Sequence, residues 1–293
     1  MSCYRLIDAQ KANHWVAIVC RVLKVSRSGY YDWKDRPLSK RARDNIALTK
    51  KIREIHTRSR QTYAYPRVHA ELKAIGVRCS RKRVARLMRK EGLQGCLRGR
   101  GRKRTTTRRD PAAIAVPDLV ERNFCAVAPN KIWTADITYL RTDEGFLYLA
   151  FILDVYSRKV VGWLMASHLR SALVGAALEM AIGRRKPSSG LIHHSDRGAH
   201  YTALSFGKRM EEAGIVASMS RMGSALDNAI SESFVSTLKS EIGVSRYLSR
   251  QAARASLFEF IERFNNRVRR HSSLGYLSPS EYEQAILEEA AVA

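Results

Sequence analysis

The succession of strand-like and helix-like segments after residue 130 limits the folds open to this chain more than any other sequence feature. Residues 132–140, 145–154 and 159–167 are rich in β-branched and aromatic side chains and are joined by short turns, which predicts an antiparallel meander. Helices are predicted next at 171–185, 205–214, 229–242 and 251–269, with two further strands at 191–196 and 215–220. This order predicts an α/β fold with a mixed five-stranded sheet flanked by helices.

The front of the chain instead has the periodicity of short helices. Apolar residues recur at helical spacing between residues 16 and 23 and again between residues 45 and 57. Ser26 is placed to cap a short helix that follows the first of these segments. The sheet is therefore expected to be preceded by an all-α region.

Residues 66–90 have the pattern of a helix-turn-helix. Pro66 suits the first turn of a helix that runs to Ala74, Gly76 breaks that helix, and Ser80 can cap the next one. The second helix has an apolar side of Val84, Leu87 and Met88 and a cationic side of Arg81, Lys82, Arg83, Arg86, Arg89 and Lys90. Such a helix can lie in the major groove of DNA, where cations hold phosphates or guanine edges. A solvated surface helix is the alternative.

Positive charge is concentrated in this front part. The chain has 52 Lys and Arg against 27 Asp and Glu, a net charge of +25. Of these residues, 31 basic and 8 acidic ones precede residue 111, so the front carries +23 and the rest +2. So large a charge opposes a compact fold and indicates a polyanionic partner, either nucleic acid or an anionic membrane surface. It favours DNA binding over a merely solvated helix.

Membrane and secretory signals are missing from the sequence. There is no run of about 18 apolar residues, so no membrane span is expected. The start of the chain lacks the apolar core and cleavage site of a signal peptide. The five cysteines include no CxxC pair, which argues against a disulfide framework or a zinc finger and fits a reducing cytoplasm.

Three segments are expected from these patterns. Residues 1–96 would form a helical DNA-binding region, residues 97–129 a basic linker, and residues 130–293 the α/β core with C-terminal helices. Gly and Arg interleave in the linker without apolar periodicity, which is typical of a flexible, charged segment. Its candidate contacts to a phosphate backbone are Arg102, Lys103 and Arg104, and a simple spacer is the alternative.

Three carboxylates of the α/β core are candidates for metal binding. Asp136 lies in an apolar strand, Asp196 ends the fourth strand, and Glu232 lies on the helix at 229–242. A carboxylate in a core strand is costly unless it is paired or binds a cation. Oxygen ligands suit Mg²⁺, and two such ions can activate one oxygen and stabilise the leaving oxygen of a phosphodiester. The alternative is that these three acidic residues lie at the surface or cap helices and turns, as most acidic residues do.

The helix at 229–242 has two distinct sides. Its apolar residues Ile230, Phe234, Leu238 and Ile242 fall on one side at a hundred degrees per residue. Glu232 and Lys239 fall together on the opposite side. The helix is therefore expected to bury one face and to present a carboxylate and an ammonium from another.

Three motifs carry a resemblance to a known family. The chain resembles the DDE transposases of bacterial insertion sequences, specifically the second reading-frame product of the IS-three family, in three strings: WTADITY (133–139), HSDRGAHY (194–201) and D-N-A-x-S-E-S-F (227–234). These enzymes are similar in turn to the retroviral integrase core. Between Asp196 and Glu232 lie 35 residues, the spacing typical of the family, and Lys239 follows Glu232 by seven positions. The resemblance extends to the helix-turn-helix and to residues 264–279.

The resemblance implies a fold, an activity and partners. Residues 130–293 would be an RNase H-like integrase or transposase core, in which Asp136, Asp196 and Glu232 hold two Mg²⁺ or Mn²⁺ ions. Metal-dependent cleavage would free a 3′-hydroxyl at the end of the element, and that hydroxyl would attack another phosphodiester. The implied partners are the terminal inverted repeats, target DNA and a second copy of the chain. An upstream reading-frame product, alone or fused by frameshifting, and a place on the bacterial nucleoid in the cytoplasm are also implied.

Several neighbouring residues have a structural interpretation beside the functional one. Lys239 is either a DNA contact near the site or a solvated helix lysine. His193 and His194 either orient a ligand or fill the core, and Asp227 is as well explained as an N-cap. Asp154 is interpreted as capping the turn after its strand. Packing is the predicted role of Trp133, Trp163 and His271, with a place along the DNA path as the alternative for His271.

Two other functions stay open on the sequence alone. A metal-dependent nuclease of the same fold would hydrolyse DNA without joining it. A DNA-binding repressor would use a core that has lost its activity, although the presence of all three carboxylates argues against it.

Overall fold

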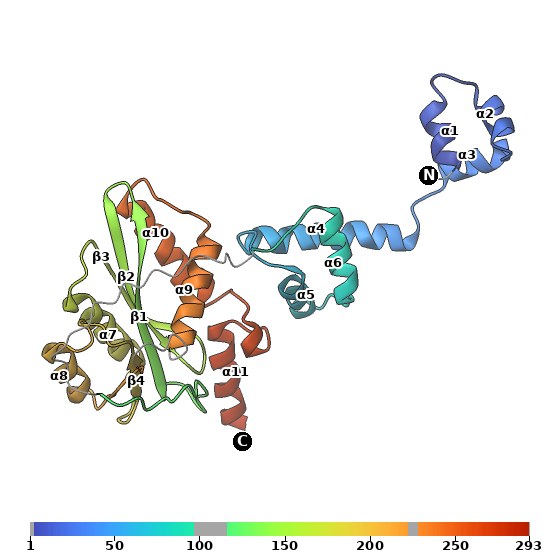
Figure 1. Cartoon of the computed structure of the whole chain (residues 1–293). Helices are drawn as coiled ribbons and strands as arrows, with labels where there is room; N and C mark the ends of the chain where they lie inside the picture. The colour runs from blue at the N-terminus through green and yellow to red at the C-terminus, as the bar shows by residue number, and fades with distance from the viewer. Residues whose placement is uncertain (1–2, 97–115, 222–227, 293) are drawn as a thin grey trace. The chain divides into compact units, whose positions relative to one another are not determined.

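The computed structural model describes residues 3–96, 116–221 and 228–292, and the chain divides into two compact units (Figure 1). The first unit is Met1–Glu54 and the second is Ile55–Ala293. The predicted phosphate contacts Arg102, Lys103 and Arg104 lie outside the described residues, as does Asp227.

The first unit is a small helical bundle. It contains α1 (Cys3–Gln10), α2 (Val16–Val22) and α3 (Arg27–Asp35), and α4 (Lys40–Arg58) begins in it. Ile7, Cys20 and Tyr30 form its buried centre. The Ser26 hydroxyl accepts a hydrogen bond from the Gly29 amide at 2.9 Å, so the predicted cap of α3 is confirmed. The helical periodicity of the sequence did not predict α1.

The second unit opens with the predicted helix-turn-helix. Its helices are α5 (Tyr65–Ala74) and α6 (Arg81–Lys90). Gly76, with φ of 77°, lies in the turn, where a side chain would be strained. Ser80 caps α6 by accepting from the Arg83 amide. The predicted apolar side of α6 is confirmed, since its buried residues are Val84, Leu87 and Met88.

The core of this unit is the predicted five-stranded sheet. Its strands are β1 (Ile132–Thr142), β2 (Gly145–Asp154), β3 (Val160–Ala166), β4 (Ile192–Ser195) and β5 (Val216–Met219). Their order is β3-β2-β1-β4-β5. The first three strands are antiparallel, whereas β4 is parallel to β1 and β5 is parallel to β4. This meander followed by two parallel strands confirms the mixed sheet and the RNase H-like class.

Helices cover both faces of the sheet (Figure 1). One face packs against α7 (Ser171–Arg185) and α8 (Leu204–Glu212), with Ile152, Leu178 and Phe206 in a shared apolar cluster. Gly162 on β3 permits this approach, because a Cβ there would lie 2.2 Å from the Ala177 carbonyl oxygen. The other face packs against α9 (Ala229–Ile242) and α10 (Arg250–Phe258), where the Phe151 and Phe234 rings lie 4.7 Å apart.

The C-terminal segment is fastened to the sheet by polar contacts. After α10 come a π-helical stretch (Glu259–Asn265), a short 3₁₀ turn (Ser272–Leu274) and α11 (Pro279–Val292). The Asn266 side chain accepts from the Val160 amide at 3.0 Å and donates to the Val160 carbonyl at 2.9 Å. The sequence pattern did not single out α11 as a helix. Within the described ranges, no helix is both long and apolar enough to cross a bilayer.

Candidate active site

Asp136 lies at an open edge of the sheet. Strand β4 pairs with β1 only through Ile132–Thr134, so the β1 edge beyond Thr134 is not covered by β4. On its other side β1 stays paired with β2, where Asp136 lies opposite Phe151. The Asp136 Oδ1 atom accepts a hydrogen bond from the Ile137 amide at 2.7 Å. The carboxylate is thus held at a fixed place where the sheet opens.

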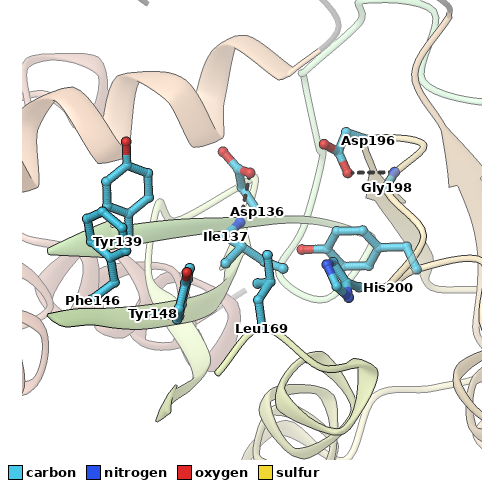
Figure 2. A pocket seen from close by; sticks show the side chains of 10 residues that line it. Asp136, Ile137, Tyr139, Phe146, Tyr148, Leu169, Asp196, Gly198 and His200 are labelled. Atoms are coloured by element: carbon cyan, nitrogen blue, oxygen red, sulfur yellow. Dashed lines mark hydrogen bonds between the residues drawn. The ribbon is translucent and has the colours of Figure 1, made fainter. Parts of the chain in front are cut away.

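Asp196 faces the same opening from the end of β4. It follows the last residue of that strand, and its Oδ1 atom accepts from the Gly198 amide at 3.1 Å. Asp136 and Asp196 line one pocket of about 310 Å³. Figure 2 shows their carboxylates on the same side of β1, with the Asp196 carboxylate directed toward Asp136. The structure therefore brings two of the three predicted carboxylates together.

Glu232 is close enough to act on Asp136 but does not line the pocket. It lies in the first turn of α9 and is half-buried. Its neighbour Ser231 is fully buried and donates to the Thr134 hydroxyl at 3.1 Å, which fixes α9 against β1. Among the described residues, no three His, Cys, Asp or Glu side chains meet closely enough to hold a metal ion. The role of the three residues as a metal centre therefore stays a prediction.

The electrostatics of Asp136 favour a cation. Burial, together with the charges of Asp196 and Glu232, raises the pKa of its carboxyl to about 7, against the opposing effects of the Ile137 amide and Lys239. Two carboxylates that share a site repel each other when both are ionised. A hard divalent cation with a preference for oxygen ligands would relieve this repulsion. The donors present therefore fit an ion such as Mg²⁺.

Lys239 extends from α9 toward the same region. Its Nζ atom lies 5.1 Å from the centre of the Tyr139 ring, within the range of a cation–π contact. Burial lowers the pKa of Lys239, and the charge of Asp136 opposes this effect. Glu232 and Lys239 thus both act on Asp136, in agreement with their placement on one side of the helix.

The two histidines of β4 belong to the core. His193 is buried against the Phe206 and Tyr201 rings, at 5.4 Å and 6.2 Å between centroids. Burial lowers the pKa of His193 to about 4, so it is neutral at physiological pH. His194 is also buried, and its Nδ1 atom lies 2.9 Å from the Ser218 hydroxyl. Their packing supports the structural interpretation.

Asp154 and Trp133 have the structural roles that the sequence suggests, whereas Trp163 lies only partly in the core. Asp154 is fully buried, and its Oδ1 atom accepts from the Tyr156 and Ser157 amides at 2.9 Å and 3.1 Å, so it caps the turn after β2. Trp133 is fully buried. Trp163 is only half-buried, and its indole N–H donates to Glu262 at 2.7 Å.

Tyr201 is a pocket residue that sequence reasoning missed. It lines the pocket together with Asp136 and Asp196. Its hydroxyl is buried and has no hydrogen-bond partner among the described residues. Burial raises its pKa well above 10, and the charges of Asp136 and Asp196 act in the same direction, so the phenol stays protonated. The only signal in the sequence is its place five residues after Asp196 in the motif.

The cationic side of α6 is largely exposed. Arg81, Lys82 and Arg86 are exposed, whereas Arg83 is half-buried. Exposure is necessary for contact with DNA, but it does not distinguish a DNA-binding helix from a solvated surface helix. The DNA contacts of α6 therefore stay predictions.

Family models match the parts of the chain that contain the helix-turn-helix and the sheet. The model of an integrase core domain matches residues 126–225, and a second integrase core domain model matches residues 213–279. An HTH-like domain model matches residues 42–101. Among solved structures, the catalytic core of HTLV-2 integrase in complex with magnesium is 15% identical, with a TM-score of 0.43 over 54% of this chain and 99% of that chain.

Relatives of known sequence match almost the full length. The 31 kDa protein of insertion element IS600 from Shigella sonnei is 42% identical over 93% of this chain and 100% of its own length. Transposase InsF of insertion sequence IS3A from Escherichia coli K12 is 39% identical over 96% of this chain and 98% of its own length. Because these relatives match almost its full length and an integrase core domain model matches its sheet region, the chain belongs to the IS3 family of transposases and is a DDE polynucleotidyl transferase.

Proposed function

We propose that this chain cuts the ends of an insertion element and joins them to target DNA, with Asp136, Asp196 and Glu232 holding two divalent ions, Mg²⁺ or Mn²⁺. The observation that carries the proposal is the pair of carboxylates, Asp136 and Asp196, that line one pocket at the open edge of β1. Glu232 supports it as the third acidic group that acts on Asp136.

The residues of the pocket have separate tasks in this reaction. Bound divalent ions would activate the attacking oxygen and stabilise the leaving oxygen of the phosphodiester. The Ile137 and Gly198 amides hold the Asp136 and Asp196 carboxylates in fixed orientations, so little reorganisation is needed when DNA binds. The Lys239 ammonium would attract a backbone phosphate toward the pocket.

Two successive displacements at phosphorus account for cutting and joining. In the first, water attacks a phosphodiester at the element end, a P–O bond to the water oxygen forms while the P–O3′ bond breaks, and a 3′-hydroxyl and a 5′-phosphate are left. In the second, that hydroxyl attacks a target phosphodiester, one P–O bond forms and another breaks. The protein supplies position and electrostatic stabilisation in both steps, and no covalent bond to the protein is required.

The proposal extends to partners beyond the pocket. Arg81, Lys82, Arg83 and Arg86 on α6, with Arg102, Lys103 and Arg104 in the linker, would hold the terminal inverted repeats. Two paired ends require at least two copies of the chain. The upstream reading-frame product, or a fusion with it, would complete the assembly on the nucleoid in the bacterial cytoplasm.

Strand transfer in a purified system tests the proposal. Labelled element-end DNA and target DNA are incubated with the full chain and Mg²⁺, and cleaved and joined products are separated on a gel. Asp136→Asn should reduce both products to background, because the change removes an anionic oxygen ligand. Asp8→Asn, in the first unit, is the matched control and should leave both products unchanged.

Each alternative outcome has a clear meaning. Cleavage without joining would identify a nuclease instead of a transposase. DNA binding without either product, in a chain that is folded, would favour a repressor. Unchanged products from Asp136→Asn would exclude Asp136 from the metal centre.

A further inference from the structure

One half of the pocket is aromatic, and carboxylate chemistry does not explain it. Tyr139, Phe146 and Tyr148 line the pocket beside Asp136, and we call them the aromatic shelf. Their ring centroids are 4.9 Å apart for Tyr139 and Phe146, 6.2 Å for Phe146 and Tyr148, and 6.4 Å for Tyr139 and Tyr148. Figure 2 shows the aromatic shelf on one side of Asp136 and Asp196 on the other.

The strand register keeps the aromatic shelf in place. Tyr139 on β1 pairs with Tyr148 on β2, so the two side chains project from the same face of the sheet. Phe146 lies two residues before Tyr148 and therefore projects from that face as well. The shelf is thus built on two paired strands and not on a loop.

Part of the aromatic surface is open. The Phe146 side chain is 44% exposed, although its ring contacts both tyrosines. Cross-strand aromatic pairs stabilise a hairpin, and this explains why the rings touch each other. It does not explain why they also form one wall of a pocket of about 310 Å³, a volume within the range of ligand sites.

The charges around the aromatic shelf indicate which ligand would fit. Lys239 lies over the Tyr139 ring. Asp136 lies three residues before Tyr139, about 10 Å away along the strand, and projects from the opposite face of β1, so the two side chains meet the same pocket at the open edge of the strand. A planar apolar group could stack on Phe146 and Tyr148 while an attached anion met the Lys239 ammonium. A nucleotide has this combination of parts, and bases of any sequence stack on aromatic side chains.

From this arrangement we infer that the aromatic shelf binds an unpaired nucleobase of the DNA strand whose phosphodiester lies at Asp136 and Asp196. The inference rests on the proposed function, since it takes the pocket to act on DNA. It adds a requirement: the end of the duplex must open at the pocket, so that at least one base leaves its partner and stacks on the exposed Phe146 ring.

A fluorescent base tests the inference locally. The full chain is mixed with a DNA duplex that carries a short single-stranded tail containing 2-aminopurine, without divalent ions so that no cleavage occurs. Stacking on the aromatic shelf should change the fluorescence of the tail. A tail of the same length with abasic sites should bind more weakly, by on the order of tenfold for each stacked base.

Two substitutions separate the aromatic shelf from general effects. Phe146→Leu should abolish the fluorescence change and the preference for bases over abasic sites. Phe258→Leu is the matched control, because Phe258 is 48% exposed and does not line the pocket, and it should retain both. Circular dichroism of both variants establishes that they are folded.

The outcomes distinguish the inference from the proposed function. Equal binding of base-containing and abasic tails, or an unchanged signal in Phe146→Leu, would overturn the inference even if strand transfer proceeds with Mg²⁺. Loss of strand transfer in the parent chain, with the base preference intact, would overturn the proposed function and leave the aromatic shelf as a site for single-stranded DNA.

Discussion

The Tyr201 hydroxyl shows how a single atom can be unfavourable for folding. It is buried in the pocket without a partner among the described residues, whereas the Tyr63 hydroxyl accepts from the Arg270 amide at 2.8 Å and donates to the Val268 carbonyl at 3.2 Å. A buried polar group that lacks a hydrogen bond opposes folding, and one that has its partners supports it.

Removal of each hydroxyl should therefore have opposite effects on stability. Tyr201→Phe, in metal-free protein, should leave the free energy of unfolding unchanged or raise it by about 1 kcal/mol. Tyr63→Phe should lower it by about 1–2 kcal/mol, since two hydrogen bonds are lost. Urea unfolding followed by circular dichroism measures both. A large loss in Tyr201→Phe would mean that its hydroxyl is already paired in the free protein.

Buried ion pairs fasten the helix that carries Glu232. Arg269 donates to the two Glu241 oxygens at 2.8 Å and 2.7 Å, and both side chains are almost fully buried. Arg67 of α5 also reaches Glu241, at 3.4 Å. Since Glu241 and Glu232 share α9, this cluster holds the helix that positions the third acidic group.

Loss of the buried arginine should be far more costly than loss of an exposed one. Arg269→Ala leaves Glu241 buried without its bidentate partner and should lower the free energy of unfolding by about 3–5 kcal/mol. Arg246→Ala removes an exposed pair with Asp143 and should cost less than about 1 kcal/mol. Thermal unfolding compares the two variants, and equal losses would contradict the importance of burial.

The attachment of α11 should depend on pH through Glu283. Burial acts to raise the pKa of this carboxyl, but hydrogen bonds from Arg185, Lys159 and Ser157 outweigh it, so the pKa lies below the usual 4.5. A group whose pKa is lowered by folding contributes stability above its unfolded pKa and loses it as the pH falls.

Glu283→Gln should therefore be less stable than the parent at pH 7, by about 2 kcal/mol. The difference should narrow as the pH falls below about 4.5, because the carboxyl of the unfolded parent then takes up a proton while that of the folded parent, with its lowered pKa, still resists protonation. Urea unfolding at pH 7 and at pH 4 tests this. A difference that stays constant between the two pH values would mean that the Glu283 charge does not contribute.

At the scale of the whole molecule, features that depend on local sequence were predictable, whereas contacts between residues far apart in the sequence were not. The β-branched runs were sufficient to predict β1 to β3, and the motifs pointed to Asp136 and Asp196, which line one pocket, whereas the role of Glu232 stays a prediction. Helix α11 was missed, although Pro279 at its start was an available signal. The pairing of Glu71 with Arg270 joins residues 199 positions apart, and nothing in either local sequence indicates it.

The two consecutive arginines Arg269 and Arg270 connect the helix-turn-helix with the helix that carries Glu232. Arg270 donates to Glu71 on α5 at 2.8 Å, and Arg269 donates to Glu241 on α9. The helix-turn-helix and the helix of Glu232 are therefore fastened to one short stretch of backbone. With DNA bound as proposed, the geometry of the fold would set a fixed spacing on it. This spacing is the number of base pairs between the sequence that α6 reads and the phosphate that is cut.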